Sequence, residues 1–147
     1  MAGTVALALA AAALSGDAGR AVVVRDEGGE ELVRVGLPAS GRFALGYRHS
    51  YYGAPAQERF QADGGGFRLS SLASPSAAVL DYYALAGRRT REAGWLRLTP
   101  GEQRRYERLS LIATTEGRRT LLVGGRRFPL YGPEARHLTI TVESGGS

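Results

Sequence analysis

The chain has 147 residues, of which 44% are hydrophobic and 22% are charged. This size and balance are typical of one globular domain, and they exclude both an intrinsically disordered chain and a protein with several membrane spans. The sequence has no cysteine, which excludes disulfide bonds, cysteine-ligated metal sites and thiol nucleophiles, while its 21 glycines predict many turns rather than long helices.

All 19 basic residues are arginine, and the formal net charge of the chain is +5. A positive net charge attracts anionic partners over long range. The arginines are nevertheless scattered, and most of their doublets, at residues 88–89, 104–105, 118–119 and 126–127, lie next to glycine or in expected turns. No nucleic-acid-binding motif accompanies them. We therefore interpret them as solvated loop charges and expect no nucleic-acid partner.

The N-terminus carries an uninterrupted apolar run at residues 4–14. The run is too short to cross a bilayer comfortably and has the length of the apolar region of a secretory signal. Small side chains at Gly16 and Ala18 fit cleavage before Gly19. We expect residues 1–18 to be a cleaved export signal; the alternatives are an uncleaved anchor, which would be the only membrane contact, and an alanine-rich helix packed on the domain. Export predicts a periplasmic or other extracytoplasmic location.

Short β-rich segments separated by glycine-containing turns follow this run. Residues 21–25 and 31–35 bracket a turn and predict a hairpin, and residues 58–62 and 66–72 predict a second one. In the last of these segments we expect strict alternation, with one face formed by Phe67, Leu69 and Ser71 and the other by Arg68, Ser70 and Leu72.

The second half of the chain continues this pattern. Further strands are expected at residues 95–99, 109–114, 120–123, 126–130 and 137–142, and Pro129 predicts an edge strand. Residues 76–85 fit either a helix or a strand. About ten short strands with turns every 8–12 residues predict an all-β fold, a single antiparallel β-sandwich or barrel. We expect this β domain to cover residues 19–143 and a flexible tail to occupy residues 144–147.

The segment at residues 47–60 concentrates tyrosine, histidine, serine and carboxylate side chains. We expect a strand at residues 47–52, followed by a turn that brings Glu58 opposite His49 or Ser50. The order carboxylate, histidine, hydroxyl is that of a nucleophilic triad and also that of a buried polar network that holds a hairpin. Adjacent residues of a strand point in opposite directions, so we favour the network and assign no catalytic residue.

The same turn brings Arg48 near Glu58, which leaves two outcomes open. One is a cross-strand ion pair between these two side chains at the surface. The other is an exposed patch of Arg48, Tyr51 and Tyr52 that captures an organic anion such as a dicarboxylate, because arginine binds carboxylates in a planar, bidentate way. We expect the ion pair.

The block Tyr47-x-His49-Ser50, followed by Glu58-x-Phe60, resembles the hallmark of a family of small exported bacterial proteins classed as a domain of unknown function. Members of that family are often encoded beside tripartite periplasmic (TRAP-type) transporters of the TAXI class. The resemblance implies export, an association with solute uptake and five signature positions, but no reaction.

We therefore expect an extracytoplasmic, non-enzymatic β domain that acts as an accessory of a TRAP-type uptake system and contacts transporter subunits or a small organic anion. The candidate binding residues are Tyr47, Arg48, His49, Ser50, Glu58 and Phe60. The alternatives are a module that binds an organic anion, a small hydrolase that uses His49 and Glu58, and a structural module of the envelope. The sequence points to no cofactor and no metal.

Overall fold

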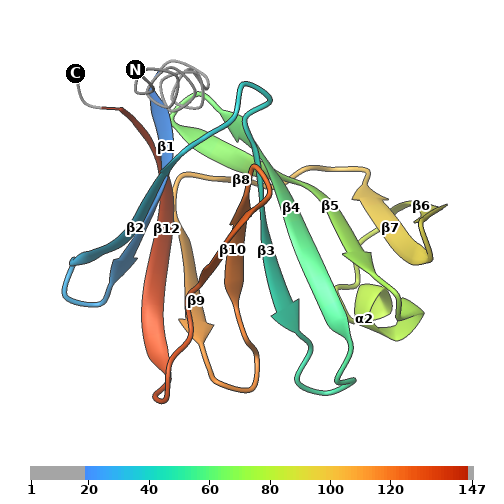
Figure 1. Cartoon of the computed structure of the whole chain (residues 1–147). Helices are drawn as coiled ribbons and strands as arrows, with labels where there is room; N and C mark the ends of the chain where they lie inside the picture. The colour runs from blue at the N-terminus through green and yellow to red at the C-terminus, as the bar shows by residue number, and fades with distance from the viewer. Residues whose placement is uncertain (1–18, 146–147) are drawn as a thin grey trace, which may run out of the picture.

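The computed structural model describes residues 19–145, which form strands almost throughout (Figure 1). Within this range the strands are β1 (Arg20–Asp26), β2 (Glu31–Gly36), β3 (Arg42–Arg48), β4 (Pro55–Asp63), β5 (Gly66–Ser74), β6 (Gly87–Glu92), β7 (Trp95–Pro100), β8 (Arg105–Tyr106), β9 (Leu109–Ala113), β10 (Thr120–Val123), β11 (Arg126–Pro129) and β12 (Arg136–Ser144). One short helix, α2 (Ala77–Tyr82), lies between β5 and β6. Of the two structures that fit residues 76–85, the segment therefore adopts the helix. The all-β prediction is confirmed, whereas the expected export signal lies outside the described residues.

The strands form two antiparallel sheets, which Figure 1 shows on the left and on the right of the molecule. The four-stranded sheet has the order β2-β1-β12-β9, and the eight-stranded sheet has the order β11-β10-β3-β4-β5-β7-β6, with β8 paired to β5. The sheets do not close into a barrel, so that predicted alternative is excluded. The terminal place of β11 confirms the edge position expected from Pro129.

One hydrophobic core lies between the two sheets. Alternate residues of both sheets contribute to it, among them Val22, Val24, Leu138 and Ile140 from the smaller sheet and Phe43, Leu45, Phe60, Phe67, Leu98 and Leu121 from the larger one. Alternation arises because successive side chains of a strand point to opposite faces. The remaining side chains of the larger sheet therefore project from its outer face, away from the core.

A β-bulge changes the faces of β5. Ser70 is an extra residue there, since Ser71 and Leu69 lie opposite consecutive residues of β4, and the Ser70 hydroxyl donates to the backbone carbonyl of Arg59 at 3.0 Å. An extra residue reverses the faces of everything beyond it, so Leu72 joins Leu69 in the core and Ser71 turns outward. The strict alternation predicted for this segment is therefore wrong beyond Ser70.

Several connecting segments meet at one end of the molecule. The turn after β3, the helix α2 and the loop between β9 and β10 all lie at the lower end in Figure 1, whereas β1 begins and β12 ends at the opposite end. In residues 19–145 no helix has the length and apolar character needed to span a membrane.

Charged side chains form a network on the smaller sheet. Glu143 accepts hydrogen bonds from Arg25, whose Nη2 lies 3.1 Å from Oε1, and from the Thr141 hydroxyl at 2.7 Å, while Arg34 Nη2 lies 3.4 Å away. Hydrogen bonds from Arg25 and then from Thr141 lower the pKa of Glu143 from its ordinary value of 4.5 to about 2.

This lowered pKa predicts the behaviour of the protein in acid. Because the folded pKa is depressed, the Glu143 carboxylate stabilises the fold above about pH 4.5, and this contribution is lost as the pH falls toward about 2. Glu143→Gln should lower the melting temperature near neutral pH, and the difference from wild type should vanish in strong acid. The side chain is partly exposed, so we expect an effect below about 1 kcal/mol. Thermal melts across the acid range check this, and an equal effect of Glu134→Gln, an exposed control, would contradict it.

Candidate functional site

Two hollows adjoin the end of β3, where Tyr47 and Arg48 line both of them. The first, which we call the end pocket, opens between the two sheets and has a volume of about 500 Å³. It is lined by Tyr47, Arg48, His49, Ser50, Glu58, Tyr82, Tyr83, Ile112, Thr114, Gly117 and Arg119. Five of the six candidate residues therefore meet here; the sixth, Phe60, is 1% exposed and lies in the core.

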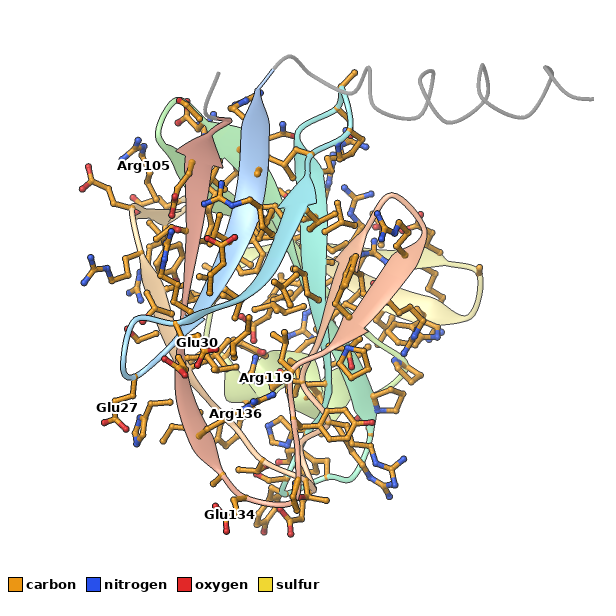
Figure 2. All side chains as sticks on the ribbon, turned by 60° about the vertical axis from the view of Figure 1, so that its left-hand side comes forward. Glu27, Glu30, Arg105, Arg119, Glu134 and Arg136 are labelled. Atoms are coloured by element: carbon orange, nitrogen blue, oxygen red, sulfur yellow. The ribbon has the colours of Figure 1, made fainter. Side chains whose placement is uncertain are left out.

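Glu58 is the centre of a hydrogen-bond network in the end pocket. Its Oε1 accepts from Arg119 Nη1 at 2.9 Å and from the Tyr83 hydroxyl at 3.2 Å. The Tyr83 hydroxyl also bonds to the Tyr47 hydroxyl, and the Arg119 guanidinium lies 4.3 Å from the centre of the Tyr47 ring. Figure 2 shows Arg119 at the lower end of the molecule, in front of α2. The charge of Arg119 is thus already neutralised inside the protein.

The two tyrosines of this network titrate far from neutrality. Burial is the main cause that raises the pKa of Tyr83, and the nearby carboxylate of Glu58 adds to it. Burial also raises the pKa of Tyr47. Both hydroxyls therefore stay protonated at neutral pH, where they serve as hydrogen-bonding groups and not as bases.

His49 lies buried under aromatic rings at the rim of the end pocket. Its Nδ1 accepts from the backbone N–H of Tyr52 at 3.3 Å, and its ring centre lies 4.7 Å from that of Tyr82 and 5.2 Å from that of Tyr52. Among the described residues no hydrogen bond joins His49 to Glu58 or to Ser50, which is exposed in the turn. The arrangement that a triad needs is therefore not assembled.

The hairpin that carries the block has a different register from the predicted one. The strand ends at Arg48, before His49, so the alternation expected over residues 47–52 stops there. Arg48 pairs with Pro55, and Glu58 pairs with Leu45. Since Glu58 points toward the space between the sheets and Arg48 toward the outer face, the expected ion pair between them is wrong. The turn after β3 is longer than the three residues assumed, which shifts the pairing by three positions.

Exposed aromatic side chains surround the mouth of the end pocket. Tyr51 is 80% exposed and Tyr82 is 68% exposed, and the Tyr51 ring packs edge-on against Tyr52 at 4.9 Å. Tyr51 and Tyr52, two members of the patch expected to capture an anion, thus lie at this rim, while the third, Arg48, lines both hollows.

The second hollow, which we call the arginine groove, lies on the outer face of the eight-stranded sheet. It has a volume of about 500 Å³ and is lined by Gly46, Tyr47, Arg48, Gly53, Pro55, Ala56, Gln57, Trp95, Arg118, Thr120, Leu122 and Arg127. No carboxylate lines it. In the part of the chain that the structure describes, the guanidinium groups of Arg48, Arg118 and Arg127 take part in no ion pair.

Strand pairing explains how these residues converge. Gly46 pairs with Gln57 on one side and with Thr120 on the other. Because the central residue of these three has no side chain, the surface of the sheet is hollow there. Arg127 pairs with Leu122 and forms one margin, while Trp95, at the turn of the β6–β7 hairpin, forms the other. The groove therefore lies between two hairpins, β10–β11 and β6–β7, which stand on either side of the strands β3, β4 and β5.

The sequence interpretation missed Trp95, Arg118 and Arg127. It treated the arginine doublets as loop charges. Arg118 and Arg119 do lie in the turn before β10, where Arg118 has a φ of 49°, whereas Arg126 and Arg127 belong to β11, where neighbouring residues project from opposite faces. Of the doublet Arg118–Arg119, Arg118 lines the arginine groove and Arg119 the end pocket. Of the doublet Arg126–Arg127, Arg127 lines the groove and Arg126 lies 4.9 Å over the Phe128 ring.

Metal ligands do not cluster in the described residues. Within residues 19–145 no group of three His, Cys, Asp or Glu side chains is placed to hold a metal ion. The groups available for chemistry are therefore the tyrosine hydroxyls, the Glu58–Arg119 pair, His49 and the unpaired arginines.

Comparison with known proteins points to one family. The family described as Domain of unknown function (DUF1850) matches residues 43–130. This range contains every residue that lines the end pocket and the arginine groove. No curated protein and no solved structure matches the chain significantly.

Proposed function

The chain belongs to the family Domain of unknown function (DUF1850), and we propose that it is a non-enzymatic binding module that holds a small organic anion in the arginine groove. One observation carries this proposal: within residues 19–145, three guanidinium groups that make no ion pair converge on a groove that no carboxylate lines. Arginine presents a planar fork of donors that fits a carboxylate in a bidentate way. A concave site of one charge also concentrates the field that attracts such a ligand.

The rest of the groove suits the carbon skeleton of an organic acid. Trp95, Pro55 and Leu122 offer apolar surface, and Gln57 and Thr120 offer polar groups for orientation. Such a combination of apolar lining and a few polar groups is typical of small-molecule sites. The end pocket is less suited to an anion, because Glu58 lines it and is paired with Arg119, one of its two arginines.

Binding is favoured over catalysis by the side chains of the groove itself. Among its lining residues there is no histidine or carboxylate that could act as a general base, and no serine beside such a base. In the end pocket, His49 and Glu58 are both present but are held apart in separate contacts. This separation supports a binding module over the hydrolase considered from the sequence.

We place this module outside the cytoplasm, as an accessory of a TRAP-type uptake system that contacts its transporter subunits. The support is the apolar run at residues 4–14 and the block that resembles the exported family. Sequencing the N-terminus of the protein isolated from cells tests export, and co-purification of a tagged chain with transporter subunits tests the association. Recovery of an uncleaved chain with no transporter subunit would remove this part of the proposal.

Neighbouring arginines provide a matched test of the anion site. Isothermal calorimetry with succinate, citrate and benzoate should detect binding to the full chain. Arg127→Ala should weaken it by about tenfold or more, because a charge-assisted hydrogen bond is lost. Arg126→Ala removes the same charge from the adjacent residue, which does not line the groove, and should change the affinity by about twofold at most. No heat with any acid, or equal losses in both variants, would refute the proposal.

A further inference from the structure

A third hollow adjoins the arginine groove on the same face of the eight-stranded sheet. It has a volume of about 490 Å³, and its charged lining consists of Arg42, Arg59, Arg97 and Glu92. We call these four residues the second cluster. Leu122 lines both this hollow and the arginine groove, so the two hollows meet at that side chain.

The register of the sheet fixes the spacing of the two charged sites. Arg42, Ala44, Gly46 and Arg48 are alternate residues of β3 and therefore project from the same outer face. Arg42 belongs to the second cluster and Arg48 to the arginine groove, and six residues of strand separate their Cα atoms by about 20 Å. Between them, Ala44 pairs with Leu122 on one side and with Arg59 on the other. Leu122 pairs in turn with Arg127, so this row of the sheet has an apolar centre and an arginine at each end.

The second cluster has more positive charge than its carboxylate neutralises. Glu92 Oε2 lies 3.3 Å from Arg59 Nη1 and 3.9 Å from Arg97 Nη1. Arg97 Nε is buried and has no hydrogen-bond partner among the described residues. Arg42 makes no ion pair in residues 19–145. Three guanidinium groups thus share one carboxylate, and this excess of positive charge favours an acceptor from outside the chain.

We propose that the arginine groove and the second cluster hold the two ends of one elongated organic dianion, of the chemical class of linear α,ω-dicarboxylates. This inference rests on the proposed function, because the arginine groove supplies one of the two anchors. The charged ends of the ligand meet arginines, and its apolar middle lies over Ala44 and Leu122. A nucleic acid would instead need cations along its whole length, since it carries a charge on every nucleotide.

Glu92 competes with the ligand for the guanidinium groups of the second cluster. Its carboxylate contacts both Arg59 and Arg97, so a dianion must displace it or share these donors. Removal of this negative charge should therefore strengthen dianion binding. A gain of affinity is an informative readout, because a misfolded variant cannot produce it.

Calorimetry on the full chain with linear dicarboxylates of increasing length, and with monocarboxylates of matched length, tests the inference. We expect long dicarboxylates to bind about tenfold more tightly than monocarboxylates, since they engage two arginine sites at once. Arg42→Ala should abolish this advantage and leave monocarboxylate binding unchanged. Glu92→Gln should raise the affinity for long dicarboxylates several-fold, whereas Glu30→Gln, an exposed control in the turn between β1 and β2, should not.

The outcomes separate this inference from the proposed function. If monocarboxylates bind through Arg127 but neither ligand length nor Arg42→Ala matters, the second anchor is refuted and the proposed function stands. If no carboxylate binds, both are refuted. Tighter binding of a single-stranded oligonucleotide than of any dicarboxylate, with the same dependence on Arg42 and Arg127, would show that the face holds a polyanion and would overturn the inference.

Discussion

Replacement of Phe60 by alanine is expected to lower the free energy of unfolding by about 3–5 kcal/mol. The Phe60 ring is 1% exposed and lies 5.2 Å from the centre of Phe43 and 5.3 Å from that of Phe67. Its loss leaves a cavity that the two neighbouring rings can fill only in part. Denaturant unfolding followed by tryptophan fluorescence measures the change.

Two further variants locate the cause of this effect. Phe60→Leu should cost less than about half as much, because it keeps most of the buried volume. Tyr51→Ala removes an aromatic ring that is 80% exposed and should change stability by about 0.5 kcal/mol or less. A Phe60→Ala protein that unfolds like wild type but no longer binds anions would show a ligand contact in place of the structural role described here.

Glu58→Ala is expected to lower the free energy of unfolding by about 2 kcal/mol. The substitution leaves the Arg119 guanidinium and the Tyr83 hydroxyl without the acceptor that both share, in a pocket where the Glu58 side chain is only 14% exposed. Unfolding by urea measures the change. Glu27→Ala, which removes an exposed carboxylate at the periphery in Figure 2, serves as the control and should be nearly neutral.

Glu58→Ala also separates the role of the end pocket from that of the arginine groove. Anion binding in the arginine groove should survive Glu58→Ala, since Glu58 does not line that groove. A combined Glu58→Ala and Arg119→Ala protein should be more stable than the sum of the single losses predicts, because the second change removes the orphaned charge. Additive losses would mean that the ion pair contributes nothing to the fold.

The strands whose side chains fill the core could be predicted from the sequence. The β-branched run of β1 and the alternation of β12 place Val22, Ile140 and their neighbours in the core, as the pattern requires. Strands without that pattern escaped prediction. All six residues of β6 are exposed, so the sequence of this strand shows no hydrophobic alternation. In β3, Phe43, Leu45 and Tyr47 do alternate, but the predicted strand at residues 47–52 began where the observed one ends.

The candidate site was predictable only where its residues are close in sequence. Five residues of one segment do line the end pocket, but their main partners come from far along the chain: Tyr83 is 25 residues from Glu58, and Arg119 is 61 residues away. Which arginine of the pair Arg118–Arg119 faces inward depends on the turn before β10, where Arg118 has a φ of 49°, and on the register between β10 and β3. A single sequence carries no signal for that register beyond alternation, and the long turn after β3 displaced even the local pairing.

The open form of the larger sheet leaves two edge strands, β6 and β11, whose backbone groups could pair with a neighbouring molecule. Both edges carry arginine: Arg88, Arg89 and Arg91 on β6, and Arg126 and Arg127 on β11, where Pro129 also lacks a backbone donor. Two such edges repel each other when they approach, and the proline leaves a gap in any new ladder. The arginine doublets thus oppose edge-to-edge aggregation of the chain, while one member of the β11 doublet also lines the groove.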